Sequence, residues 1–264
     1  MTTAASRLPA THALLTADAR AGLNSPPARW LLAPAAAAWL MLLWLAGSDQ
    51  TLALCLAPRP TLLEGFRANL AAEFHLVPPM RWAGEWTLMI VAMMFPLLVP
   101  MVSHVATRCF AASRQRSVAL FVGSFFVVWL IASAGASLAL VLSRAALQAF
   151  HLAAWAGLIG SVLAATWQLS NAKVRAINRC HGTIALRPWP RDADRDAIGF
   201  GLLHGTRCVR ACLPVMILPL IGGQGLAAMA AVSAILLAER ARKQPQYRLS
   251  AVAILLLGLL SLVP

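Results

Sequence analysis

The sequence is poor in charged residues, and above all in acidic ones. Charged residues make up 12% of its 264 positions, and only 9 residues are Asp or Glu against 22 that are Lys or Arg. Hydrophobic residues make up 60% of the chain. A soluble domain of this composition would expose too much apolar surface to water. The composition therefore excludes an ordinary soluble protein and favours an integral membrane protein.

Several motifs of common enzymes and pumps are also missing. The chain has no HExxH motif, no P-loop, no phosphorylated-aspartate motif and no recognisable Ser-His-Asp arrangement or carboxylate pair. Its five cysteines form no close pair outside the apolar stretches, so they give no sign of a disulfide framework. We therefore expect neither an enzyme nor an ATP-driven pump.

Seven apolar stretches dominate what is present. Most have roughly 17 to 25 residues, the length with which an α-helix crosses a bilayer. The stretches are Trp30–Ala46, Trp86–Ala106, Val118–Leu142, Leu152–Ser170, Gly199–Ile221, Leu226–Ala238 and Leu249–Val263. The sequence predicts an all-α, polytopic membrane helix bundle over residues 29–264, preceded by a flexible cytoplasmic tail over residues 1–28.

The basic residues divide unequally between the two sides of these stretches. With the amino terminus in the cytoplasm, only Arg59, Arg67, Arg81 and Arg144 fall on the outer side. This asymmetry is typical of membrane insertion with positive loops inside. Together with Ala- and Arg-rich usage, it predicts a bacterial inner membrane protein. Because the net charge of +13 lies in short loops beside the spans, we expect anionic lipid at the cytoplasmic face as a partner, and no nucleic acid.

The number of spans has one alternative. A single helix over Ala211–Ala238 would reduce the seven spans to six. Against it, Gly222, Gly223 and Gly225 form a helix-breaking cluster with Gln224, which is typical of a tight turn. We therefore favour seven spans.

One long extracytoplasmic loop is expected at residues 47–85. Within it, apolar residues recur at helical spacing over Thr61–Leu76, which predicts an amphipathic helix at the outer interface.

The fifth stretch carries a row of potential metal ligands. His204, Cys208, Cys212 and Met216 follow one another in steps of four, so they lie along one side of a helix. Thiolate and thioether groups favour Cu(I), and imidazole suits copper or zinc. The alternative is that the cysteines are small buried hydrophobic residues and that His204 is hydrogen-bonded in the core.

Two arginines share this stretch, Arg207 and Arg210. Ionisable residues inside a membrane usually mark a functional interior face. We expect them to meet backbone carbonyls, polar side chains, lipid phosphate or water.

The second stretch carries a matching row of sulfur. Met93 and Met101 lie on one face, and Pro96 leaves the carbonyl of Ala92 without its helical donor. In a membrane that carbonyl needs a partner from protein, water or an ion. If the second and fifth stretches are neighbours, the two rows form one column of ligands. Methionine filling gaps in a kinked helix is the alternative.

The segment after the fourth stretch contains a further candidate ligand, Cys180, followed by His181. They could be docking ligands, or they could belong to a solvated basic loop. The acidic cluster of Asp192, Asp194 and Asp196 is expected in a solvated loop.

Three motifs taken together resemble a known family. They are AMMFPLLVPM (92–101), WQLSNAK (167–173) and GLLHGTRCVRACLPVM (201–216), the last followed by AER (238–240). The chain resembles an uncharacterised bacterial family of predicted metal-binding integral membrane proteins. It departs from that family at two cysteine positions, where Ala176 and Ala211 stand. The resemblance implies a polytopic inner-membrane protein with a metal site.

The leading functional hypothesis joins these observations. The chain binds or passes a soft transition metal between its second and fifth transmembrane helices, with Cu(I) favoured over zinc. A metal-delivery partner or a larger membrane complex would receive it. The expected ligands are His204, Cys208, Cys212, Met216, Met93, Met101 and Cys180. A structural or assembly subunit and a dithiol redox protein are the alternatives.

Overall fold

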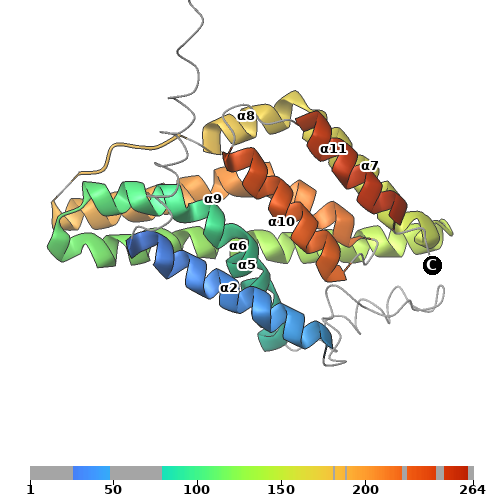
Figure 1. Cartoon of the computed structure of the whole chain (residues 1–264), viewed down its shortest axis with the longest axis horizontal. Coiled ribbons are helices and arrows are strands. Elements are labelled where there is room, and N and C mark those ends of the chain that lie inside the picture. The colour runs from blue at the N-terminus through green and yellow to red at the C-terminus, as the bar shows by residue number, and fades with distance from the viewer. Residues whose placement is uncertain are drawn as a thin grey trace, which may run out of the picture.

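The computed structural model describes residues 26–47, 79–180, 182–187, 189–221, 225–241 and 247–260. The described chain is entirely helical apart from short connections, as Figure 1 shows. Its eight α-helices are α2 (Pro26–Gly47), α5 (Pro79–Arg108), α6 (Ala111–Ala149), α7 (Ala156–Leu169), α8 (Asn171–Cys180), α9 (Pro190–Leu220), α10 (Gly225–Ala241) and α11 (Tyr247–Leu260). A 3₁₀ turn at Ala153–Trp155 precedes α7.

The expectation of an all-α fold is confirmed. Each of the seven apolar stretches falls largely within one helix, namely α2, α5, α6, α7, α9, α10 or α11. By length and composition three of the described helices can cross a membrane, at Arg29–Ala46, Trp82–Arg108 and Ala112–Ser143. The apolar helices α7 and α11 are shorter. The tail before residue 26 and most of the long loop, including the predicted helix at Thr61–Leu76, lie outside the described residues.

The alternative with one helix over Ala211–Ala238 is wrong. Helix α9 ends at Leu220 and α10 begins at Gly225. Gly225 has a φ of 72°, a left-handed conformation that glycine adopts without a side-chain clash. The last glycine of the cluster therefore begins α10, separate from α9.

Two expectations about loops are also corrected. The segment after the fourth stretch is a helix, α8, rather than a loop. The acidic cluster lies in the first turns of α9, where carboxylates interact favourably with the helix dipole. Asp194 pairs with Arg116 of α6 at 2.9 Å, and Asp196 pairs with Arg187 at 2.8 Å.

Close packing of α9 on α6 builds the centre of the molecule. Gly201 and Gly205, four residues apart, allow the approach, because a Cβ at Gly205 would lie 2.9 Å from the Cβ of Val128. Elsewhere α2 packs on α5, α11 packs on α7, and α8 packs against α9 (Figure 1). Helix α9 is therefore the element around which the candidate ligands are arranged.

The carbonyl released by Pro96 finds a protein partner. The indole Nε1 of Trp39 in α2 donates to the Ala92 oxygen at 3.1 Å. This hydrogen bond across two helices satisfies the expectation that the carbonyl would be paired inside the bundle.

Candidate metal centre

Three cysteine sulfurs meet where α8 crosses α9. Cys208 and Cys212 lie one turn apart on α9, with their sulfur atoms 4.0 Å apart. Cys180, the last residue of α8, accepts a hydrogen bond from the thiol of Cys208. All three side chains are buried. We call Cys180, Cys208 and Cys212 the thiol cluster.

The spacing of the α9 pair suits one soft metal ion. With metal–sulfur bonds of about 2.3 Å, two sulfurs 4.0 Å apart subtend an angle of about 120° at the metal. That angle leaves room for a third ligand. Among the described residues, no group of three or more His, Cys, Asp or Glu side chains is already placed to hold a metal. The thiol of Cys180 would therefore have to shift toward an ion held by the α9 pair.

A guanidinium group lies against the thiol of Cys180. Nη1 of Arg240, in the last turn of α10, donates to the sulfur of Cys180 at 3.1 Å. The hydrogen bond from Cys208 and the positive charges of Arg240 and Arg207 lower the pKa of Cys180 to about 6, against the opposing effect of burial. Thiolate is the form that binds metals, so this residue is prepared to act as a ligand at neutral pH.

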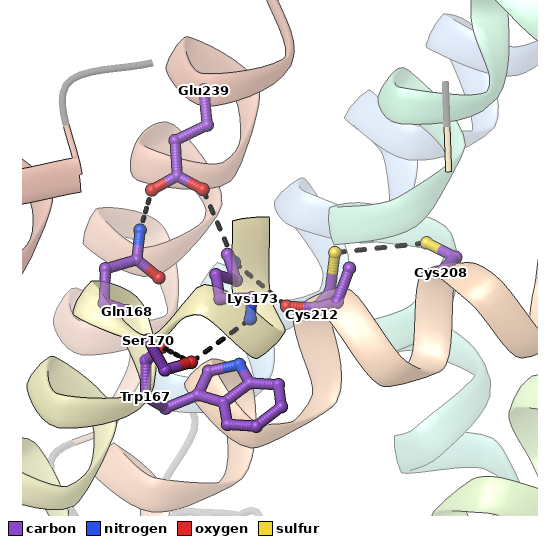
Figure 2. A network of polar contacts seen from close by, with 8 residues as sticks. Trp167, Gln168, Ser170, Lys173, Cys208, Cys212 and Glu239 are labelled. Atoms are coloured by element: carbon purple, nitrogen blue, oxygen red, sulfur yellow. Dashed lines mark hydrogen bonds and ion pairs between the residues drawn. The ribbon is translucent and has the colours of Figure 1, made fainter. Parts of the chain in front are cut away.

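A buried network of ionic and polar groups adjoins the thiol cluster (Figure 2). Nζ of Lys173 in α8 donates to the carbonyl oxygen of Ala211 at 2.9 Å and lies 3.4 Å from Oε2 of Glu239 in α10. Nε2 of Gln168 in α7 donates to the other carboxylate oxygen of Glu239. The side chains of Lys173, Glu239 and Gln168 are almost fully buried. Because Ala211 directly precedes Cys212, the network links four helices at the thiol cluster.

His204 lies apart from these contacts. It is one turn before Cys208 on α9, buried among the rings of Phe121, Phe125 and Phe200. The ring centroids lie 6.1, 5.9 and 5.9 Å away, respectively. Two of these rings belong to α6, so the imidazole faces the α6 side of α9.

The methionines are buried in the same core as the thiols. Met93, Met101 and Met216 belong to one cluster of buried side chains with Cys208. Helix α5, which carries Met93 and Met101, packs mainly on α2 and α6, whereas α9 packs mainly on α6, α7 and α8. The second and fifth stretches are thus not extensive packing partners. The single ligand column stays a prediction.

One expectation about the membrane arginines is confirmed. Nη1 of Arg207 donates to the backbone carbonyl of Arg179 at 3.2 Å, at the end of α8. Arg210 is exposed.

Sequence reasoning did not foresee the partners of Lys173. Lys173 can be buried because it pairs with Glu239, which lies far along the chain. The hydrophobic periodicity of the two segments does not reveal this pairing. A signal was nonetheless present, because the motif WQLSNAK supplies Gln168 and Lys173, and the motif AER supplies Glu239 and Arg240. Two of the three motifs behind the resemblance, WQLSNAK and GLLHGTRCVRACLPVM with the AER that follows it, converge on one site.

Comparison with known proteins agrees with a role in handling metal. Residues 83–263, well over half of the chain, match a family model described as PpoB2, copper chaperone. The matched region includes the thiol cluster and its ionic network. The description names a chaperone rather than an enzyme, in agreement with the expectation from the missing catalytic motifs. Comparisons with curated proteins and with solved structures gave no significant match.

Proposed function

Because the chain belongs to the PpoB2 family of copper chaperones, we propose that it binds Cu(I) at the thiol cluster inside a membrane helix bundle and passes the ion to a partner protein. The observation that carries this proposal is the meeting of three buried cysteines from α8 and α9, two of them 4.0 Å apart. Buried thiolates favour soft metals such as Cu(I) over hard ions such as magnesium and calcium, and the family description favours copper over zinc.

Thioethers extend the proposed site through the core. Met216 on α9 and Met93 and Met101 on α5 share the buried core with the thiols. Thioether is a neutral, soft ligand for Cu(I). These methionines supply weaker sites along which the ion moves between the second and fifth helices.

The surface of the bundle supports the membrane part of the proposal. Large apolar side chains face outward on three helices, with Leu40 of α2 68% exposed, Ile131 of α6 70% and Leu260 of α11 66%. Such a surface fits lipid rather than water. All described helices except α8 span the bacterial inner membrane in this proposal, with the amino terminus in the cytoplasm and the basic loops on anionic lipid.

In this arrangement α8 lies at the cytoplasmic rim of the membrane, since it follows the fourth span. Cys180 at its end therefore places the thiol cluster close to the cytoplasmic side. A soluble or membrane-bound delivery partner exchanges copper there.

Copper binding to the purified, full-length protein tests the proposal. Titration with Cu(I) under anaerobic conditions, against a competing chelator, should show about one bound ion and no binding of Mg²⁺ or Ca²⁺. The double variant Cys208→Ser/Cys212→Ser should lose the ion. Cys109→Ser is the matched control, because Cys109 is also buried but does not belong to the thiol cluster, and it should bind as the wild type does.

Methionine variants test the extended site separately. Met93→Leu and Met101→Leu nearly conserve side-chain volume, so they should weaken binding without disturbing the fold. Wild-type protein that binds neither copper nor zinc at micromolar concentrations would overturn the proposal and favour an assembly subunit.

A further inference from the structure

Arg240 is a partly buried cation whose identified partner is a sulfur atom. Its Nη1 contacts Cys180 at 3.1 Å. Within the described part of the chain, its Nε and Nη2 atoms are buried and make no hydrogen bond. A guanidinium group stays protonated at all accessible pH values, so its charge is permanent.

The positive charge of Arg240 faces the thiol cluster, and its identified counter-charge is the Cys180 thiolate rather than a carboxylate. Lys173 is neutralised by Glu239, which lies 3.4 Å from its nitrogen. Arg207 contributes a second positive charge from the rim, where it binds the carbonyl of Arg179. Arg240 thus adds a positive charge that no carboxylate offsets in any described ion pair, directly beside the proposed position of the metal.

We propose that Arg240 is a specificity-determining residue, which makes the thiol cluster prefer monovalent soft cations over divalent ones. The inference rests on the proposed function, because it concerns which metal that same site selects. Three thiolates and one monovalent ion leave a negative site that a guanidinium group stabilises. A divalent ion adds one more positive charge, which the guanidinium group repels.

The size of this preference follows from distance. As long as Cys180 keeps its 3.1 Å contact with Arg240, a metal bound to its sulfur at about 2.3 Å lies at most about 5.4 Å from Nη1. At an effective dielectric constant of about 20, repulsion of one extra unit charge over that distance lowers affinity by about 100-fold.

The ratio of the affinities for a monovalent and a divalent ion separates the charge effect of Arg240 from a general weakening of the site. Removing Arg240 also makes the Cys180 thiolate less stable, which weakens binding of every metal that displaces its proton. That loss is common to a monovalent and a divalent ion that use the same thiols. The ratio of their dissociation constants therefore reports the charge of Arg240 rather than a general weakening of the site.

Ag(I) and Cd(II) are suitable probes, because both prefer sulfur and neither changes oxidation state in the titration. We would measure both dissociation constants on the full-length protein in detergent, for the wild type, Arg240→Gln and Arg240→Lys. The neutral variant should shift the ratio toward Cd(II) by about 10- to 100-fold, whereas the lysine variant should keep it within a few-fold. Arg210→Gln, which removes an exposed arginine of α9, is the matched control and should leave the ratio unchanged.

The outcomes are distinct. An unchanged ratio in Arg240→Gln, with both metals still bound, overturns the role of Arg240 and leaves the proposed function intact. Wild-type protein that binds neither Ag(I) nor Cu(I) overturns the proposed function itself. If Arg240→Gln does not fold by gel filtration and circular dichroism, Arg240→Met provides a second neutral variant with an apolar stem that suits the partly buried position.

Discussion

Removing the charge of Lys173 should destabilise the protein strongly, because it leaves the carboxylate of Glu239 buried without a cation. The two charged groups lie 3.4 Å apart and are 0% and 3% exposed. At an effective dielectric constant of about 20, their attraction is about 5 kcal/mol. Loss of one member of a buried pair typically costs about 3–5 kcal/mol. We expect Lys173→Met to lower the free energy of unfolding by that amount.

A double-mutant cycle tests the origin of this cost. Glu239→Gln leaves the Lys173 ammonium buried and should cost a similar amount, while the amide retains the shape of the side chain. The double variant Lys173→Met/Glu239→Gln buries no unpaired charge, so its cost should fall short of the sum of the single variants by about 2 kcal/mol or more. Equilibrium unfolding in mixed micelles, followed by circular dichroism, measures all four proteins.

Two results would refute this reasoning. Costs of less than about 1 kcal/mol for both single variants would mean that the pair is solvated rather than buried. Strictly additive costs would mean that Lys173 and Glu239 do not interact, and that the contact between α8 and α10 depends on other groups.

Two further predictions concern the thiol cluster and helix α5, which contains Pro96. With the pKa of Cys180 near 6 and below its ordinary value of 9.0, its thiolate absorbance should persist at pH 7. The stability that it provides should be complete above about pH 9.0, decline as the pH falls, and be lost below about 6; Cys180→Ser should remove this dependence. Trp39→Phe should leave the Ala92 carbonyl unbonded and cost about 1 kcal/mol by thermal unfolding, and a change below a few tenths would contradict the hydrogen bond.

The positions of the apolar helices could be predicted from the sequence because they depend on local properties. Length and hydrophobicity locate a helix whatever its neighbours are. Pro96 removes a donor from its own helix, so the need of the Ala92 carbonyl for a partner is also local. The turn at Gly225 follows from the conformational freedom of glycine. Which residue pairs with the Ala92 carbonyl depends on how the helices pack together. The sequence therefore does not identify Trp39 as the donor.

Helix α8 and its lysine were harder to predict for the same reason. The segment from Asn171 to Cys180 is rich in basic residues, a pattern shared by solvated loops and by helices at a membrane rim. Lys173 can be buried because it forms an ion pair with Glu239, a residue far from it in the sequence. The segment is a helix rather than a loop, and the helix places Cys180 at a defined position beside α9.

The spacing of the candidate ligands on α9 predicts the side of the helix on which they lie, but not the neighbours that each side chain contacts. Steps of four residues rotate by about 40° each on a helix of 3.6 residues per turn, so His204 and Cys212 point about 80° apart. His204 accordingly packs against Phe121 and Phe125 of α6, whereas Cys208 contacts Cys180 of α8. His204 is one turn from Cys208, as Cys212 is, but its ring contacts lie on the α6 side of α9.

From these ring contacts we predict that His204 contributes to packing rather than to copper affinity. His204→Leu should leave the dissociation constant for Cu(I) within about three-fold of the wild type, because the thiols and their spacing are untouched. The same variant should change the fit against the aromatic rings of α6, which thermal unfolding would register. A loss of affinity comparable to that of Cys208→Ser would show instead that α9 rotates on binding and brings His204 to the metal.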